Sequence, residues 1–196
     1  MLASMASAAT RVLRLGAIGI GTGILVAALV GGIGSRIVMR LLFLGNGATK
    51  GSITENGNEV GVITLGGTAS LVFFIALFLG VPGGLMYVVT RRWLTESWLA
   101  RGLLYGALLL LLFGGGAIDS DNIDFRIFGP VWLGIALFGL LPFLFGLGLA
   151  YLVDRWDPYV PTLFRRHWVT VGGYAVLIGL ALFGAVDFAG TVNELL

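Results

Sequence analysis

The sequence contains no cysteine, one histidine and few charged side chains. The absence of cysteine excludes disulfide bonds, thiolate metal sites, iron–sulfur ligation and cysteine nucleophiles. Charged residues make up 11% of the 196 residues, whereas a soluble domain carries about 25%. With so few charges and 58% hydrophobic residues, the chain cannot build a surface that faces water all round. The composition therefore predicts a protein that faces a lipid bilayer.

Five long apolar stretches divide the sequence. They are residues 15–34, 62–89, 99–118, 127–153 and 169–186. Each approaches or exceeds the roughly 20 residues that cross a bilayer as a helix. The first is longer than the apolar core of a signal peptide and lacks a clear cleavage site, so we expect it to be retained. The sequence predicts an all-α integral membrane bundle of five transmembrane helices, forming a single domain over residues 1–196.

The short segments that flank these stretches alternate in charge. Arginine is in excess in the N-terminal segment and in the second and fourth connecting segments, and the other three are acidic or mixed. Because arginine and lysine concentrate in cytoplasmic loops, this alternation predicts a cytoplasmic N-terminus and a C-terminus outside. The net charge of +2 is too small to indicate binding of nucleic acid.

Residues 45–61 form a connecting segment long enough to hold structure of its own. Residues of β-prone type flank the pair Asn56-Gly57, and Asn-Gly in such a setting is the strongest short signal for a hairpin. We expect a short β-hairpin on the outer surface. A solvated loop is the alternative, because an isolated two-stranded hairpin is marginally stable.

Glycine accounts for 32 residues. Three pairs have the spacing that allows helices to approach closely in lipid, namely Gly19 and Gly23, Gly80 and Gly84, and Gly102 and Gly106. This spacing indicates tight helix packing.

Two prolines lie inside the predicted helices. Pro82 and Pro142 each remove a helix hydrogen bond, so we expect kinks in the second and fourth helices. The sequence around them also suggests that residues 127–186 repeat residues 62–118, which would make a parallel repeat. Chance similarity between apolar, glycine-rich helices is the alternative.

Residues with catalytic or metal-binding chemistry are scarce. No ionisable residue lies near the middle of any predicted helix, which argues against a proton-coupled pump. The sequence has no G-x-S-x-G, H-E-x-x-H or P-loop motif. His167 suits an interfacial polar role, or in principle an axial haem or chlorin ligand. We expect no enzymatic activity and assign no catalytic residue, metal ligand or cofactor.

Arg36 and Arg40 are the exception to the charge alternation. They follow the first apolar stretch on the outer side, and their spacing of four places them on one helical face. Asp119, Asp121 and Asp124, in another outer segment, are the acids best placed to compensate them. Three interpretations stay open for these five residues: a structural ion-pair cluster, a lipid phosphate site, or a site for an anionic ligand.

Residues 119–124 also have the oxygen-rich composition of a calcium loop. The glycine and the closing glutamate of an EF-hand are missing. Helix capping and a solvated turn explain the same residues, since Asp and Asn favour such positions.

Several short sequences resemble those of uncharacterised polytopic membrane proteins from actinobacteria and Chloroflexota. They are Gly66-Gly67-Thr68, Gly80-Val81-Pro82-Gly83-Gly84, Arg91-Arg92-Trp93-Leu94 and the segment 121–130. The resemblance covers most of residues 35–155. It implies a bacterial cytoplasmic membrane and implies no mechanism.

Two classes of function fit the sequence. A non-catalytic membrane subunit or scaffold, packed against partner membrane proteins or further copies of itself, is favoured by the abundant glycine, the short loops and the scarcity of reactive groups. A small transporter or permeation protein for an unknown solute is the alternative, favoured by the two prolines and the suggested repeat.

Overall fold

The computed structural model describes residues 2–46, 64–117, 130–158 and 167–195. These residues form helices and their short connections, and five helices are long and apolar enough to cross a membrane. The predicted all-α, multi-pass architecture is confirmed. The predicted β-hairpin is not supported: residues 45 and 46 belong to a helix, and the rest of the segment lies outside the described residues.

The first span is much longer than predicted. It consists of α1 (Leu2–Val26), the π-helical segment η1 (Ala27–Gly34) and α2 (Ser35–Asn46). Its apolar part covers 36 residues, or about 54 Å of helix, against a hydrocarbon thickness of about 30 Å. The apolar residues around Arg36 and Arg40 continue the helix beyond residue 34, where the predicted apolar stretch ends.

The second span consists of α3 (Leu65–Ile75), the π-helical segment η2 (Ala76–Gly80) and α4 (Val81–Thr90). Pro82 stands at the start of α4, so the change in helical hydrogen bonding comes directly before it. Pro142 differs, because α7 (Val131–Trp156) runs through it as one α-helix. The kinks expected at these prolines, and the repeat of residues 62–118 by residues 127–186, stay predictions.

The first two spans cross where glycines face each other. A Cβ atom at Gly84 would collide with the carbonyl oxygen of Gly19, and a Cβ atom at Gly23 would collide with that of Gly80. Close approach of the two backbones is possible because both helices present small residues at the crossing. The tight packing predicted from these glycine pairs is confirmed.

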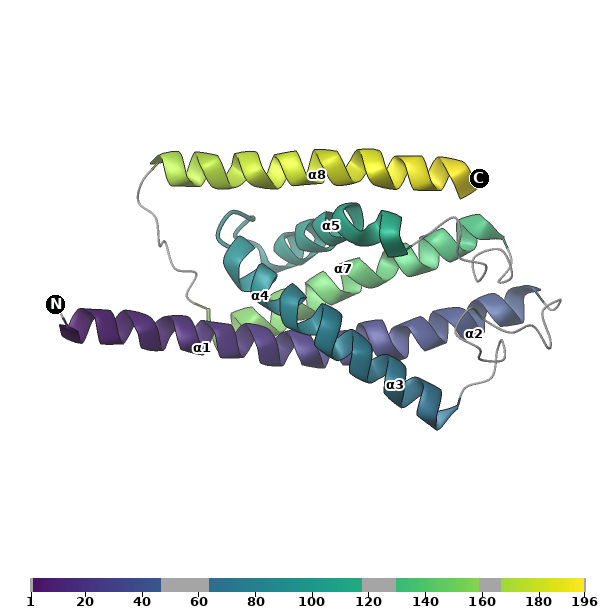
Figure 1. Ribbon diagram of the computed structural model, residues 1–196, viewed down its shortest axis with the longest axis horizontal. Coiled ribbons are helices and arrows are strands. Elements are labelled where there is room, and N and C mark those ends of the chain that lie inside the picture. The colour runs from purple at the N-terminus through teal and green to yellow at the C-terminus, as the bar shows by residue number, and fades with distance from the viewer. Residues whose placement is uncertain (1, 47–63, 118–129, 159–166, 196) are drawn as a thin grey trace.

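The third and fourth spans form a second close crossing. In α5 (Trp98–Ala117), a Cβ atom at Gly102 would lie 2.8 Å from the Cα atom of Leu147, and one at Gly106 would lie 2.5 Å from that of Phe143. Figure 1 shows α5 and α7 side by side, and α7 also contacts α1 and α2. The fourth span therefore joins the two helix crossings into one bundle.

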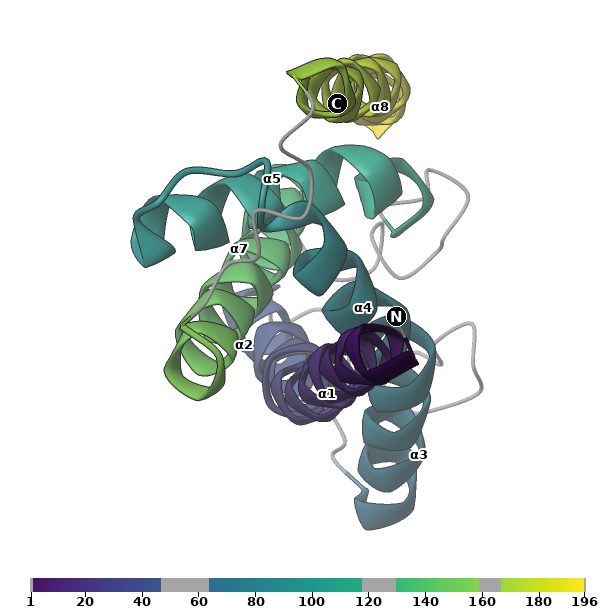
Figure 2. The same cartoon turned by 90° about the vertical axis from the view of Figure 1, so that its left-hand side faces the viewer.

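The fifth span, α8 (His167–Leu195), lies at the edge of the bundle. Figures 1 and 2 both show it beyond α5, on the side away from α1. Gly184 rests on the carbonyl group of Leu111, and Gly114 faces the ring of Phe188. Only 6% of the most apolar part of α8 is buried, whereas 22–39% of the corresponding part of each of the other four spans is buried. The helix continues past the predicted end at residue 186, so Asp187 belongs to the span.

Candidate functional site

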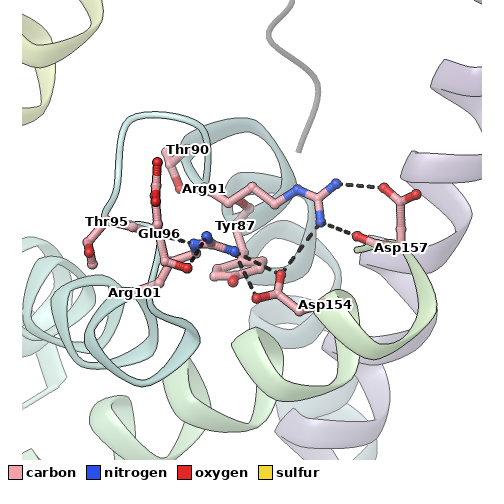
Figure 3. Close-up of polar contacts among 8 residues, drawn as sticks. All are labelled: Tyr87, Thr90, Arg91, Thr95, Glu96, Arg101, Asp154 and Asp157. Atoms are coloured by element: carbon pink, nitrogen blue, oxygen red, sulfur yellow. Dashed lines mark hydrogen bonds and ion pairs between the residues drawn. The ribbon is translucent and has the colours of Figure 1, made fainter. Parts of the chain in front are cut away.

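The largest group of interacting charged side chains in the described residues lies where α4, α5 and α7 end or begin on one side of the bundle. We call Arg91, Arg101, Asp154 and Asp157 the quartet (Figure 3). Arg91 directly follows α4, and Arg101 lies in the first turn of α5. Asp154 lies in the last turn of α7, and Asp157 directly follows that helix.

Arg101 forms the densest set of contacts. Its Nη1 atom donates to both carboxylate oxygens of Asp154, at 2.9 and 2.8 Å. Its Nε and Nη2 atoms donate to the backbone carbonyls of Thr95 and Glu96, both at 2.9 Å. One guanidinium group therefore fixes the end of α7 and the connection between α4 and α5 at once (Figure 3).

Arg91 pairs mainly with Asp157. Its Nη2 atom lies 2.6 Å from Oδ2 of Asp157, and its Nη1 atom donates to the backbone carbonyl of the same residue at 3.1 Å. Nη1 also lies 3.8 Å from Oδ1 of Asp154, which links the two pairs. Arg91 is 1% exposed and Arg101 is 5% exposed, so the attraction between these charges is screened far less than at a protein surface.

Two buried tyrosines lie beneath the quartet. The rings of Tyr87 and Tyr105 pack edge to face, with centroids 5.1 Å apart. The Tyr105 hydroxyl donates to the Gly83 carbonyl at 2.6 Å, which ties α5 to α4. The Tyr87 hydroxyl is buried and has no hydrogen-bond partner among the described residues. These rings separate the charged groups from the apolar interior of the bundle.

Three of the four charges lie at helix ends where the helix dipole disfavours them. Asp154 and Asp157 lie at the C-terminal end of α7, where the dipole disfavours a negative charge, and Arg101 lies at the N-terminal end of α5, where it disfavours a positive one. Pairing offsets both penalties, and two arginines balance two aspartates. Both carboxylates are therefore engaged by the two arginines.

The five site residues predicted from the sequence do not include any member of the quartet. Arg36 and Arg40 lie on α2, and Arg40 stacks over the ring of Phe43 at 5.3 Å. The Nε atom of Arg36 is buried and has no partner among the described residues. Asp119, Asp121 and Asp124 lie outside the described residues, so the predicted cluster of these five is not tested. In the described part of the chain, no group of three or more acidic residues or histidines could hold a metal ion.

The quartet was not predicted from the sequence, because an excess of arginine in a connecting segment indicates orientation and does not name a partner. Arg101 begins the third span and Asp154 ends the fourth. Consecutive spans run in opposite directions, so these two ends must lie on the same side of the membrane. Two aspartates on the arginine-rich side were the signal that could have pointed to the pairing.

Comparison with known proteins identifies no relative. No protein-family model matches the chain, and neither does any curated protein or solved structure. The resemblance to actinobacterial and Chloroflexota membrane proteins stays a prediction.

Proposed function

We propose that this protein is a non-catalytic membrane subunit that packs against another membrane protein through α8. The other four spans pack against one another and form the surface on which α8 lies. Two close glycine crossings join four spans, and the quartet fastens three helix ends on one side. The charged groups of the quartet bind each other and backbone carbonyls, so we assign them a role in stabilising the fold.

The observation that carries the proposal is Asp187 on the uncovered fifth helix. Its carboxylate lies against Gly115 of α5 and forms no hydrogen bond or ion pair with a described residue. An ionisable residue within a membrane span is costly and normally pairs with another polar group. A partner helix with a lysine or arginine at this depth would supply that group and cover the apolar face of α8.

We place the protein in a bacterial cytoplasmic membrane, as the resemblance and the charge alternation imply, with the N-terminus in the cytoplasm. In that orientation the quartet lies at the cytoplasmic end of the bundle. Asp187 then lies toward the outer end of α8, where a partner's cation can reach it at modest desolvation cost.

Purification of the native protein in mild detergent tests the proposal. We expect a membrane protein in stoichiometric amount with the wild-type chain, and its loss in Asp187→Asn. Glu194→Gln is the matched control, because it removes an exposed acid from the last turn of the same helix. A chain that purifies alone, or a partner that stays bound to Asp187→Asn, would contradict the proposal.

A small transporter is the alternative function. The segments η1 and η2 contact each other where the first two spans cross, and π-helical turns within α-helices are frequent at functional sites. Reconstitution into liposomes separates the two functions. If the protein is a non-catalytic subunit, the liposomes should retain trapped ions and small solutes. If it is a transporter, liposomes that contain the protein should release them and empty liposomes should not.

A further inference from the structure

Arg36 differs from the exposed arginines Arg11, Arg14 and Arg155 because part of its side chain is buried without a partner among the described residues. Its side chain is half-buried on α2, its Nε atom is inaccessible to solvent, and it makes no hydrogen bond or ion pair with a described residue. The guanidinium group stays protonated in proteins. A buried donor without an acceptor costs free energy, and a charged one costs more.

A second polar atom without a hydrogen-bond partner lies at the same level of the bundle. The Oγ1 atom of Thr68 on α3 is buried and has no hydrogen-bond partner among the described residues. The two helices meet at Gly32 and Val72, where a Cβ atom at Gly32 would lie 2.9 Å from the Cα atom of Val72. Because the helices run in opposite directions (Figure 1), Arg36 and Thr68 each lie one turn, about 6 Å, outward from this contact.

The level of these two residues places them near the membrane boundary. Thr68 lies three residues after the start of α3, which is about 5 Å from the end of that helix. Arg40 follows Arg36 by one further turn on the same face and is exposed. The Thr68 hydroxyl and the Arg36 guanidinium group therefore lie at one depth, and the Arg40 guanidinium group lies closer to the membrane surface.

We propose that Arg36 and Thr68 bind a phosphate group, that of an anionic lipid headgroup. A phosphate offers several acceptor oxygens and matches the fork of N–H donors on a guanidinium group. It also supplies a negatively charged partner for Arg36 and a hydrogen-bond acceptor for the Thr68 hydroxyl, neither of which is present among the described residues. The site lies on α2 and α3, on the far side of the bundle from α8 (Figure 2).

The test measures lipid binding to the full chain in detergent by native mass spectrometry and by thermal unfolding. Phosphatidylglycerol is compared with an uncharged glucosyl diacylglycerol of the same acyl chains, and sodium phosphate with sodium chloride at equal ionic strength. We expect phosphatidylglycerol to bind and stabilise the wild-type chain more than the other three additions. Equal stabilisation by sodium phosphate would keep the site and assign it to soluble phosphate.

Three variants separate this site from general attraction to anionic lipids. Arg36→Gln is expected to raise the dissociation constant for phosphatidylglycerol on the order of tenfold, and Thr68→Val about threefold. Arg14→Gln removes an exposed arginine from the other end of the first span and is expected to leave binding unchanged. Thr68→Val keeps both arginines and the shape of the side chain, so it reports on the site even if Arg36→Gln does not fold.

Two results would overturn the proposal. The first is binding of phosphatidylglycerol that is equal in Arg36→Gln, Thr68→Val and Arg14→Gln. The second combines two observations. The triple variant Asp119→Asn, Asp121→Asn and Asp124→Asn unfolds at as low a temperature as Arg36→Gln, and phosphatidylglycerol stabilises neither the triple variant nor the wild-type chain. That result would assign Arg36 to an ion pair with these acids.

Discussion

At the scale of single residues, the quartet illustrates how a membrane protein retains charges close to its apolar interior. Arg101 is almost fully buried, and its three donor nitrogens all have acceptors. The Asp154 carboxylate takes both of its short contacts from that guanidinium group. Burial of the pair is tolerable because each charge is compensated, and removal of one member leaves the other without compensation.

Asp154→Ala is predicted to lower the free energy of unfolding by about 3 kcal/mol, since it leaves Arg101 buried and unpaired. The double variant Arg101→Met, Asp154→Leu should recover most of this loss, because neither charge remains. Thermal or denaturant unfolding in detergent measures both. Arg155→Ala is the control, because that neighbouring arginine is exposed. A double variant with a free energy of unfolding no higher than that of Asp154→Ala would show that the two residues do not act as a pair.

At the scale of helices, glycine determines which helices lie against each other. The crossing of the first two spans leaves no room for side chains at Gly19, Gly23, Gly80 and Gly84. In lipid there is no hydrophobic force to draw helices together, so close backbone contact supplies much of the attraction. The glycines of α5 serve the same purpose at the crossing with α7.

Gly23→Ala is predicted to destabilise the fold by roughly 1–3 kcal/mol, because its Cβ atom would meet the backbone of η2. Gly21→Ala is the matched control on the same helix, where an added Cβ atom meets nothing within 4 Å. We expect that control to be neutral or slightly stabilising, because alanine favours helix. Unfolding in detergent measures the pair, and equal effects of both substitutions would argue against the crossing.

The helices could be predicted from the sequence, but their ends and partners could not be predicted equally well. Long apolar runs indicate spans because length and hydrophobicity are local properties. The fifth helix outlasts its apolar run because Asp187 and Thr191 are compatible with helix and no proline follows them. The quartet depends on which helix ends meet and on their register, which are properties of packing that no single segment contains.

At the scale of the whole molecule, the bundle is asymmetric. Four spans are joined by two close crossings, and the fifth lies along α5 with most of its surface uncovered. The quartet lies where α4 ends and α5 begins, and Asp187 lies against Gly115 near the opposite end of α5. Arg36 lies one turn beyond the contact of Gly32 with Val72, toward the start of α3. The two ends therefore differ: the quartet pairs its four charges with one another, whereas the side chains of Asp187 and Arg36 form no hydrogen bond or ion pair with a described residue.

The predicted orientation can be tested with single cysteines, because the chain has none of its own. Ser97→Cys lies in the exposed connection beside the quartet, and Asn193→Cys is exposed near the end of α8. A maleimide that cannot cross membranes, added to intact bacterial cells, should label Asn193→Cys alone. Ser97→Cys should react only after the membrane is permeabilised. The reverse pattern would invert the assigned orientation.

The quartet also has a consequence for biosynthesis. Asp154 follows Arg101 by 53 residues and Asp157 follows Arg91 by 66 residues. At a synthesis rate of about 5–20 residues per second, the arginines wait roughly 3–13 s for the partners that neutralise them. During that interval neither arginine has its aspartate partner, because the end of α7 has not yet been made. The quartet can therefore form only after α7 has been synthesised, so its two arginines are inserted into the membrane before the acids that pair with them.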